Sequence, residues 1–265
     1  MRPSDVIPFL TEKKKRCALK MLGRRSRFTP GNISIAGWDL EYLDSAAIAS
    51  SIDVLVYRGW NDFTTEKETP VILDCGANIG ISVLNYRRRY PRASITAFEP
   101  DPLAARALRR NLSVNSAGDV RVVEAAVWIE PGRAPFFVEG ADGGRILLGE
   151  MAPVTTVECV DLKDFLVDPV DLIKMDIEGA EYKLIPHIAD RLSLVGNLVV
   201  ECHLSNDDVT SFARLLQVLG DAGFSVSVNS YGAWRDLVHR PAKLPNEFDQ
   251  YLLLAAWREP EKSHR

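Results

Sequence analysis

The stretch VILDCGANIG, residues 71–80, joins an apolar run to a turn that contains two glycines and an asparagine. Its β-branched and apolar residues predict a strand over 71–75, and the residues that follow predict a helix over 81–90. Gly76 and Gly80 lack a Cβ, so the backbone can bend sharply there and a ligand can approach it closely. A parallel strand that enters a helix through such a turn predicts a ligand crevice at the carboxyl end of the strand.

Outward from this turn, apolar strands alternate with amphipathic helices, which indicates an α/β fold with a parallel sheet. The runs 224–230 and 250–258 have no helix between them, so we expect an antiparallel pair at the sheet edge. The other expected strands are 94–99, 121–127, a short edge strand at 134–139, 154–159, 171–177 and 198–202. The other expected helices are 101–115, with Asp101 as N-cap, 180–190 and 207–222.

The glycine turn departs from the pattern of dinucleotide-binding folds. Counted from Gly76, the second and third glycines of that pattern would fall on Asn78 and Ile81. Asp74 lies just before the turn, where a carboxylate would repel a pyrophosphate and attract a cationic ligand. Glu99 ends the next strand, where a carboxylate can accept hydrogen bonds from both ribose hydroxyls. The two acids together favour S-adenosylmethionine, which carries a sulfonium and an α-amino group, over NAD.

Six strings occur in order along the chain: DCGANIG, AFEPDP, RRNLSVN, AAV, VDLIKMDIEGAE and VVECH. They resemble those of FkbM-type methyltransferases, which are class I S-adenosylmethionine-dependent enzymes that mostly methylate hydroxyl groups of natural products or glycans. The resemblance covers about residues 70–205. It implies an α/β, Rossmann-like class I methyltransferase fold: a seven-stranded, mostly parallel sheet with a C-terminal antiparallel hairpin and an N-terminal helical cap.

The resemblance also assigns roles within the cofactor site. Residues of the glycine turn would contact the methionine moiety, Glu99 would hold the ribose, and Ala125 and Ala126 would border the adenine. No polar side chain that could read the adenine is evident beside these two alanines. The expected cofactor-binding residues are Asp74, Gly76, Ala77, Asn78, Gly80, Glu99, Pro100, Ala125, Ala126 and Asp176.

The string LIKMDIEGAE carries residues expected on the acceptor side of the site. Period-two alternation places Lys174 and Asp176 on one side of the strand. A lysine inside a buried strand is costly unless it is paired, so we expect it to pair with Asp176 or another nearby acid. Asp176 would lie beside the transferable methyl group, although a salt bridge that only stabilises the strand end would explain the same pattern.

The string VVECH ends the following strand and supplies the expected general base. Glu201 and His203 share one face, whereas Cys202 points the other way and is expected in the core. Because imidazole has a suitable pKa, we expect His203 to take the hydroxyl proton and Glu201 to fix its tautomer. A hydrogen-bonded structural histidine is the alternative. The expected catalytic residues are His203, Asp176, Glu201 and Lys174.

A metal site is not favoured by these patterns. The four cysteines form no CxxC pair and are expected to be reduced and mostly buried. Asp176 and Glu178 could ligate Mg²⁺, as some O-methyltransferases do with acids in this region. Further acid ligands are not evident from the sequence, so we expect no metal ligands.

Length and composition are those of an ordinary globular protein, with 265 residues, 46% hydrophobic and 26% charged. We expect an N-terminal cap at 1–68, a methyltransferase domain at 69–259 and a polar tail at 260–265. The net charge of −4 disfavours nucleic acid as a partner. No apolar run could cross a bilayer, and the N-terminal order of apolar and positive residues is the reverse of a secretory signal, so we expect a cytoplasmic location.

Together these features predict S-adenosylmethionine-dependent methylation of a hydroxyl on a sugar, a glycan or a natural-product small molecule, with S-adenosylhomocysteine as the product. An NAD-dependent oxidoreductase and a non-catalytic nucleoside-binding module on the same fold are the alternatives. The acceptor would be chosen by the N-terminal cap, the loop GADGGRI at 140–146 and the segment 231–246. An exposed edge strand would be compatible with a homodimer.

Overall fold

The computed structural model describes residues 19–23, 26–137, 144–146, 154–204, 209–231 and 250–258. Three regions named above lie wholly or mostly outside this part: the loop 140–146, the segment 231–246 and the polar tail 260–265. None of the helices in the described part of the chain has the length and apolar character that a membrane span requires.

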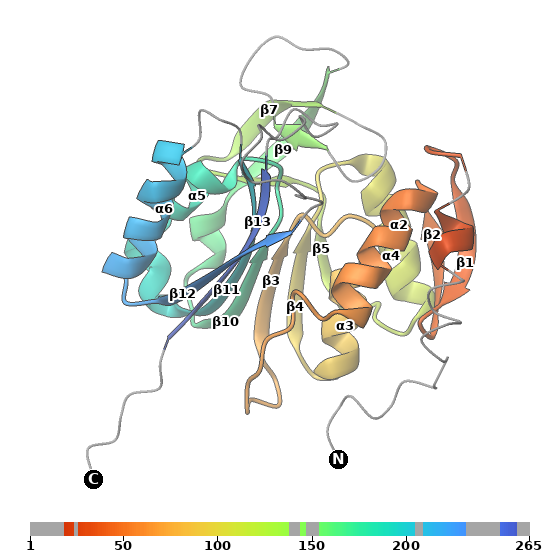
Figure 1. Cartoon of the computed structure of the whole chain (residues 1–265), viewed down its shortest axis with the longest axis horizontal. Coiled ribbons are helices and arrows are strands. Elements are labelled where there is room, and N and C mark those ends of the chain that lie inside the picture. The colour runs from red at the N-terminus through yellow and green to blue at the C-terminus, as the bar shows by residue number, and fades with distance from the viewer. Residues whose placement is uncertain are drawn as a thin grey trace, which may run out of the picture.

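A seven-stranded sheet in the order β12-β13-β11-β10-β3-β4-β5 forms the centre of the molecule (Figure 1). From β11 to β5 the strands pair in parallel, whereas β13 is antiparallel to both β11 and β12. The expected class I methyltransferase sheet with its C-terminal antiparallel hairpin is therefore confirmed. The strands are β3 (Val71–Cys75), β4 (Ser94–Phe98), β5 (Arg121–Val123), β10 (Val170–Met175), β11 (Val195–Leu204), β12 (Ser225–Tyr231) and β13 (Gln250–Trp257).

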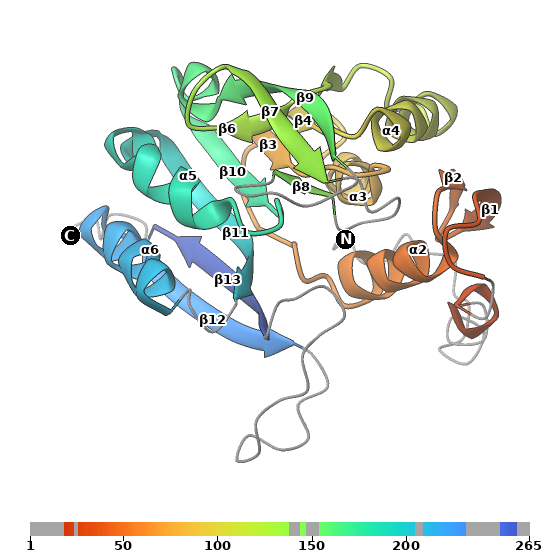
Figure 2. The ribbon, with the colours of Figure 1, turned by 90° about the horizontal axis from the view of Figure 1, so that it is seen from above.

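Helices cover both faces of this sheet (Figure 2). They are α3 (Ile81–Arg89), α4 (Pro102–Val114), α5 (Glu181–His187), which is followed by the 3₁₀ helix η4 (Ala189–Leu194), and α6 (Val209–Asp221). Successive strand residues point to opposite faces, so Ile72 packs into the core beside α3 and α4, and Leu73 into the core beside α5 and α6. Both faces are buried, which explains the continuous apolar runs that mark the strands in the sequence.

The N-terminal cap contains a β-hairpin as well as helices. Strands β1 (Gly31–Ile35) and β2 (Trp38–Tyr42) pair antiparallel, and the helix α2 (Ser45–Ser51) and the π-helix η2 (Ile52–Tyr57) follow. The Asp44 side chain caps α2 by accepting hydrogen bonds from two backbone N–H groups. Asn111 of α4 donates its side-chain amide to the carbonyl of Glu41 at 2.9 Å, which anchors the hairpin. The sequence analysis expected only helices here.

The expected third strand, 121–127, is in fact two strands in different sheets. The main-sheet strand β5 ends at Val123, and β6 (Ala126–Trp128) begins a four-stranded sheet in the order β6-β9-β7-β8. The other members are β7 (Gly132–Phe137), β8 (Arg145–Ile146) and β9 (Val154–Asp161), and the 3₁₀ helix η3 (Leu162–Phe165) follows. Period and composition predict that a segment is a strand but not which partner it pairs with, so the sequence could not reveal this second sheet.

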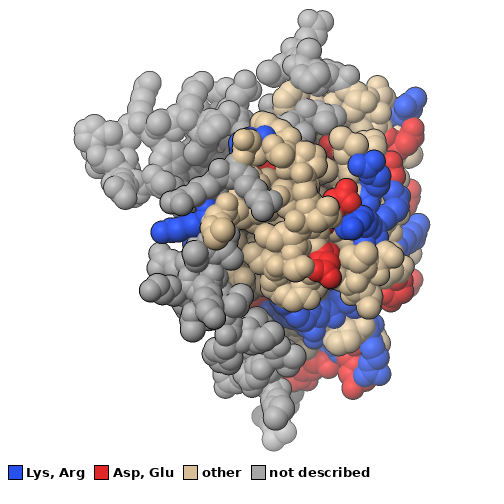
Figure 3. Space-filling view, turned by 90° about the vertical axis from the view of Figure 1, so that its right-hand side faces the viewer, with Lys and Arg blue, Asp and Glu red and all other residues tan. Residues whose placement is uncertain are grey.

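Charges of both signs lie side by side on the face that bears the N-terminal hairpin (Figure 3). Arg110 of α4, for example, pairs with Glu41 of β2 at 3.3 Å, and Arg27 pairs with Asp44 at 2.7 Å. Neighbouring charges of opposite sign cancel most of each other's long-range field. The described residues of this face therefore do not form the single-sign basic surface that binds a phosphate backbone.

Candidate active site

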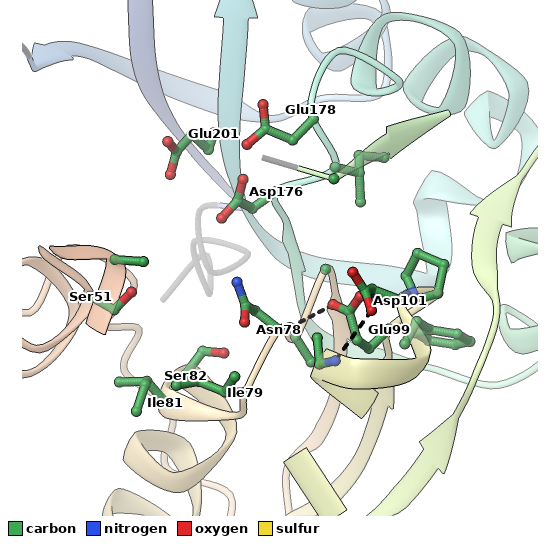
Figure 4. Close-up of a pocket in the computed structure, with 18 of the residues that line it drawn as sticks. Ser51, Asn78, Ile79, Ile81, Ser82, Glu99, Asp101, Asp176, Glu178 and Glu201 are labelled. Carbon is green, nitrogen blue, oxygen red and sulfur yellow. Dashed lines mark hydrogen bonds between the residues drawn. The ribbon is translucent and has the colours of Figure 1, made fainter. Parts of the chain in front are cut away.

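The carboxyl ends of β3, β4, β10 and β11 open onto a cavity of about 320 Å³. Figure 4 shows its two ends, with Glu99 and Asp101 at one and Asp176, Glu178 and Glu201 at the other. The cavity is lined by most of the predicted site residues, namely Gly76, Ala77, Asn78, Glu99, Pro100, Ala125, Ala126, Lys174, Asp176, Glu201 and His203. Asp74 and Gly80 are not part of this lining.

The two glycines of the turn make room for protein atoms. Gly76 has a φ of +80°, and a Cβ there would lie 1.8 Å from the backbone oxygen of Asp176. Gly80, which precedes α3, has a φ of +93°, and a Cβ there would lie 2.6 Å from Cδ1 of Leu108. The sharp bend expected at both glycines agrees with their left-handed backbone, which glycine tolerates. Both glycines also allow tight packing, of β3 against β10 at Gly76 and of α3 against α4 at Gly80.

Glu99 ties the turn after β3 to the end of β4. Its carboxylate accepts hydrogen bonds from the backbone N–H of Asn78 at 2.7 Å and of Asp101 at 2.8 Å. Burial raises the pKa of Glu99 to about 7, even though these two hydrogen bonds act in the opposite direction. Each carboxylate oxygen can accept more than one hydrogen bond, so this side chain retains capacity for a diol at the cavity wall. A ribose fits this arrangement.

Asp74 lies behind the cavity wall. It is fully buried, its Oδ2 accepts a hydrogen bond from the Ser82 hydroxyl at 2.5 Å, and Lys174 is its neighbour in the parallel pairing of β3 with β10. Lys174 Nζ lies 3.4 Å from Asp74 Oδ1 and donates a hydrogen bond to the carbonyl of Gly76 at 2.6 Å. Asp74 thus supports the glycine turn through Lys174, in contrast to the direct ligand contact expected from the sequence.

Lys174 also reaches the acceptor side of the cavity. Its Nζ lies 3.6 Å from Oδ2 of Asp176, so one ammonium is shared by two carboxylates. Burial by itself would lower the pKa of Lys174, but the charges of Asp74 and Asp176 outweigh burial and raise it. The lysine is therefore a permanent cation, paired with a nearby acid as the sequence analysis expected.

His203 stands at the centre of a cluster of carboxylates. Its side chain is 1% exposed, and its Nδ1 lies 3.4 Å from Oε1 of the fully buried Glu181. Its Nε2 lies 3.4 Å from Glu178, 3.7 Å from Glu201 and 3.9 Å from Asp176. Strands β10 and β11 pair in parallel, which brings the acids after β10 to the histidine near the end of β11.

This environment contradicts the reason for choosing His203 as the base. Burial would lower its pKa, but the charges of Glu178, Glu181 and Glu201 outweigh burial and raise the pKa to about 10. An imidazole that keeps its proton at neutral pH cannot take another one. Burial, followed by the charge of Asp176, raises the pKa of Glu201 well above the ordinary carboxyl range. Glu201 is therefore a stronger base than an ordinary glutamate.

Two contributions to the site were not identified residue by residue from the sequence. One is the carboxylate of Glu181 at the start of α5, which lies 3.4 Å from Nδ1 of His203. Residues of α2 and the π-helix, including Ser51, Val54 and Leu55, line the cavity from the N-terminal cap. The spacing of Glu178 and Glu181 around Gly179 could have indicated the role of Glu181. A π-helix, in contrast, has no sequence pattern by which we could have recognised it. Such helices occur frequently at functional sites.

The acceptor-side cluster has the composition of a cation site. One oxygen each from Asp176 and Glu178 and one ring nitrogen of His203 lie within 4.8 Å of one another. No metal site was expected, because further ligands beside Asp176 and Glu178 were not evident from the sequence. His203, which is distant in the sequence, places a ring nitrogen beside these two acids.

Known proteins that are similar to this chain are methyltransferases. Residues 74–226 match the family model described as "Methyltransferase FkbM domain". The chain is 28% identical over 211 residues to "Methyltransferase 1" of Beauveria bassiana, and the matched region covers 69% of this chain and 80% of that protein. It is 33% identical over 142 residues to "2-O-methyltransferase NoeI" of Sinorhizobium fredii, covering 45% of this chain and 58% of that protein.

Among solved structures, the fold is similar to that of M. jannaschii TYW2, whose crystal structure is a complex with AdoMet. The two share a TM-score of 0.51 at 13% sequence identity, over 89% of each chain. At this level of identity the likeness concerns the fold alone, and it agrees with the seven-stranded sheet described above.

Proposed function

Because this chain belongs to the FkbM methyltransferase family, we propose that it methylates a hydroxyl oxygen of a sugar, a glycan or a natural-product small molecule. Dependence on S-adenosylmethionine follows from the family, and the NAD-dependent alternative is not retained. The choice of oxygen as acceptor is supported by the similarity to a protein named as a 2-O-methyltransferase. It is also supported by the carboxylates at the acceptor end, which can take a proton from a hydroxyl.

The cofactor would lie along the β3–β4 end of the cavity. Glu99 would accept hydrogen bonds from the ribose hydroxyls, and the turn at Gly76–Asn78 would hold the methionine moiety. Ala125 and Ala126 line the cavity and, being small, leave room for the flat adenine ring. Asp74 would act indirectly: its ion pair with Lys174 would hold in place the turn that contacts the cofactor.

S-adenosylmethionine supplies a methyl group on a positively charged sulfur, and sulfur keeps the bonding pair when the carbon–oxygen bond forms. Asp176, held by Lys174, would position the acceptor hydroxyl on the line that joins oxygen, carbon and sulfur. Much of the acceleration comes from this alignment. Glu201 would take the hydroxyl proton, since burial and Asp176 raise the pKa of this carboxyl. His203, already protonated, would hold the surrounding carboxylates in place.

We also propose that residues 1–68 act as a cap on the methyltransferase domain at 69–259. Helix α2 and the π-helix line one side of the cavity, so their side chains would contact the acceptor. Ser51 offers a hydroxyl and Leu55 an apolar surface, a combination that suits the mixed surface of a sugar or polyketide.

The observation that carries this proposal is a single cavity that joins Glu99, suited to a ribose, with the carboxylates of Asp176 and Glu201. The test has two parts. Calorimetric titration should first show that S-adenosylhomocysteine binds. Methyl-labelled cofactor should then be offered to matched sugars that carry only hydroxyls or an additional amine, and the position of the label determined by NMR. Labelled methoxy groups are expected, whereas labelled N-methyl groups alone would contradict methylation of oxygen.

A further inference from the structure

The Nδ1 side of the His203 ring faces a buried acid. Glu181 is fully buried, its Oε1 accepts the backbone N–H of Ile177 at 3.1 Å, and the same oxygen lies 3.4 Å from His203 Nδ1. A carboxylate behind one ring nitrogen keeps a proton on Nδ1, so a metal ion can displace the proton from Nε2 and bind its lone pair. Histidines that bind metals are commonly oriented in this way, with the second ring nitrogen donating to a carboxylate.

The other ring nitrogen faces two carboxylates across distances that fit an ion. Nε2 lies 3.4 Å from Oε1 of Glu178 and 3.9 Å from Oδ1 of Asp176. Direct charge-assisted hydrogen bonds would measure about 2.7–2.9 Å. Two ligand atoms that each lie about 2.1 Å from one cation are roughly 3.0 Å apart at a right angle and about 4.2 Å apart on opposite sides. Both observed separations fall within this interval.

The balance of charge at the site points the same way. Carboxylates that are removed from water are costly unless positive charge compensates them. Two cationic side chains, Lys174 and His203, face five carboxylates here, those of Asp74, Asp176, Glu178, Glu181 and Glu201. An added cation between the carboxylates would offset this excess of negative charge.

We propose that Asp176, Glu178 and His203 bind one divalent first-row transition-metal ion, with Glu181 as the positioning residue that orients the histidine. Two carboxylates and an imidazole suit Mn²⁺, Fe²⁺ or Zn²⁺ better than Mg²⁺, which prefers oxygen ligands alone. Three protein ligands leave further coordination positions open toward the cavity. Glu201 stands outside the set of three and keeps its place as the proton acceptor.

The role that we assign to this ion depends on the proposed function, but the prediction that the ion binds does not. The open positions face the cavity that would receive the acceptor, and oxygen atoms of an alcohol are suitable ligands there. A bound ion would hold the acceptor oxygen and make its hydroxyl a better acid. The structure therefore points to an acceptor that is recognised partly through metal coordination.

The test is a titration of Mn²⁺ into protein that has been stripped of metal by a chelator, without cofactor or acceptor. Electron paramagnetic resonance reports free Mn²⁺, because its sharp spectrum is lost on binding. We expect one bound ion per wild-type chain and affinity at least tenfold weaker in Glu178→Gln. Asp176→Asn should behave in the same way, and it provides a second variant if Glu178→Gln fails to fold.

The matched control is Asp161→Asn, which alters a histidine–carboxylate pair elsewhere in the chain. Asp161 Oδ1 lies 2.9 Å from His187 Nε2, and asparagine can replace aspartate as the N-cap of η3. This variant should bind Mn²⁺ as the wild type does. Free Mn²⁺ throughout the wild-type titration, or equal affinity in Glu178→Gln, would overturn the inference.

Titration with S-adenosylhomocysteine in the same preparations separates the two proposals. Binding of the nucleoside without binding of Mn²⁺ would defeat the cation site and leave the methyltransferase function standing. Binding of Mn²⁺ without the nucleoside would do the opposite.

Discussion

At the β3–β4 end of the cavity, backbone N–H groups of neighbouring turns hold one carboxylate, that of Glu99. At the β10–β11 end, several carboxylates surround one imidazole, that of His203. The first arrangement depends on backbone shape, so it should be sensitive to steric change and to the loss of single hydrogen bonds. The second depends on charge, so it should be sensitive to pH and to ions.

The largest effect is expected from Gly76→Ala, because Gly76 in the turn after β3 packs against the backbone of Asp176 after β10. The added Cβ would overlap the backbone oxygen of Asp176, so β3 and β10 would have to separate. We expect the free energy of unfolding to fall by more than about 3 kcal/mol, together with loss of S-adenosylhomocysteine binding. Chemical denaturation and calorimetry measure the two effects.

Gly37→Ala is the control for backbone strain in this comparison. Gly37 has a similar φ of +84°, but a Cβ there would meet nothing within 4 Å. We expect this variant to lose only about 1 kcal/mol. Equal losses in the two variants would mean that close packing of β3 against β10 is not what requires glycine.

Glu201→Gln should affect chemistry at the charged end and leave the other end unchanged. Removal of the proposed proton acceptor is expected to lower kcat about 100-fold, with S-adenosylhomocysteine affinity preserved. Because burial and Asp176 raise the pKa of Glu201, the wild-type rate should rise with pH above the ordinary carboxyl range, and the variant should lack this rise. Glu158→Gln, at an exposed ion pair with Arg133, is the control. An unchanged kcat in Glu201→Gln would remove Glu201 from the mechanism.

Glu99→Gln should show the opposite pattern, with weakened cofactor binding. Loss of the charged acceptor is expected to reduce S-adenosylhomocysteine affinity about tenfold. Burial raises the pKa of Glu99 to about 7, so wild-type affinity should increase as pH rises through this value and the carboxyl ionises. Isothermal titration at several pH values tests both statements. Glu124→Gln is the control, since Glu124 pairs with Arg109 at the surface. Equal affinities would place the ribose elsewhere.

The smallest effect concerns stability at the charged end. The pKa of His203 is raised from 6.5 to about 10, so its contribution to stability is fully present below pH 6.5 and is lost as pH rises through about 10. We expect wild-type stability to fall more steeply across this window than that of His203→Gln. Urea denaturation near the two limits measures the difference, and parallel curves for both proteins would refute the assignment.

The β3–β4 end of the cavity could be predicted in large part because its elements are adjacent in the chain. Asp74, the glycine turn and α3 follow one another, and Glu99 ends the next strand, which pairs directly with β3. Parallel strands bring their carboxyl ends to one edge, so adjacency in the sequence becomes adjacency in space. The burial of Asp74 could not be predicted, because a sequence pattern does not reveal how deep a side chain lies beneath the surface.

At the β10–β11 end of the cavity, the sequence predicted which residues take part but not how they pair or how far apart they lie. A buried lysine requires an acid, which correctly indicated that Lys174 is paired. Its second partner, Asp74, depends on the register of β3 against β10. The three acids that raise the pKa of His203 lie on a turn, a helix and a strand, and their distances to the imidazole follow from how these elements pack.

From the amino-acid order alone came the alternation of strands and helices, the class of fold and the two acids that favour a cationic nucleoside. These features depend on local pattern and on the rule that parallel strands end at one edge. Tertiary structure alone decided which acid is buried, which group keeps its proton and which side chains surround the imidazole. Electrostatic energies change with separation and with exclusion of water, and both quantities are set by packing between elements that are distant in the chain.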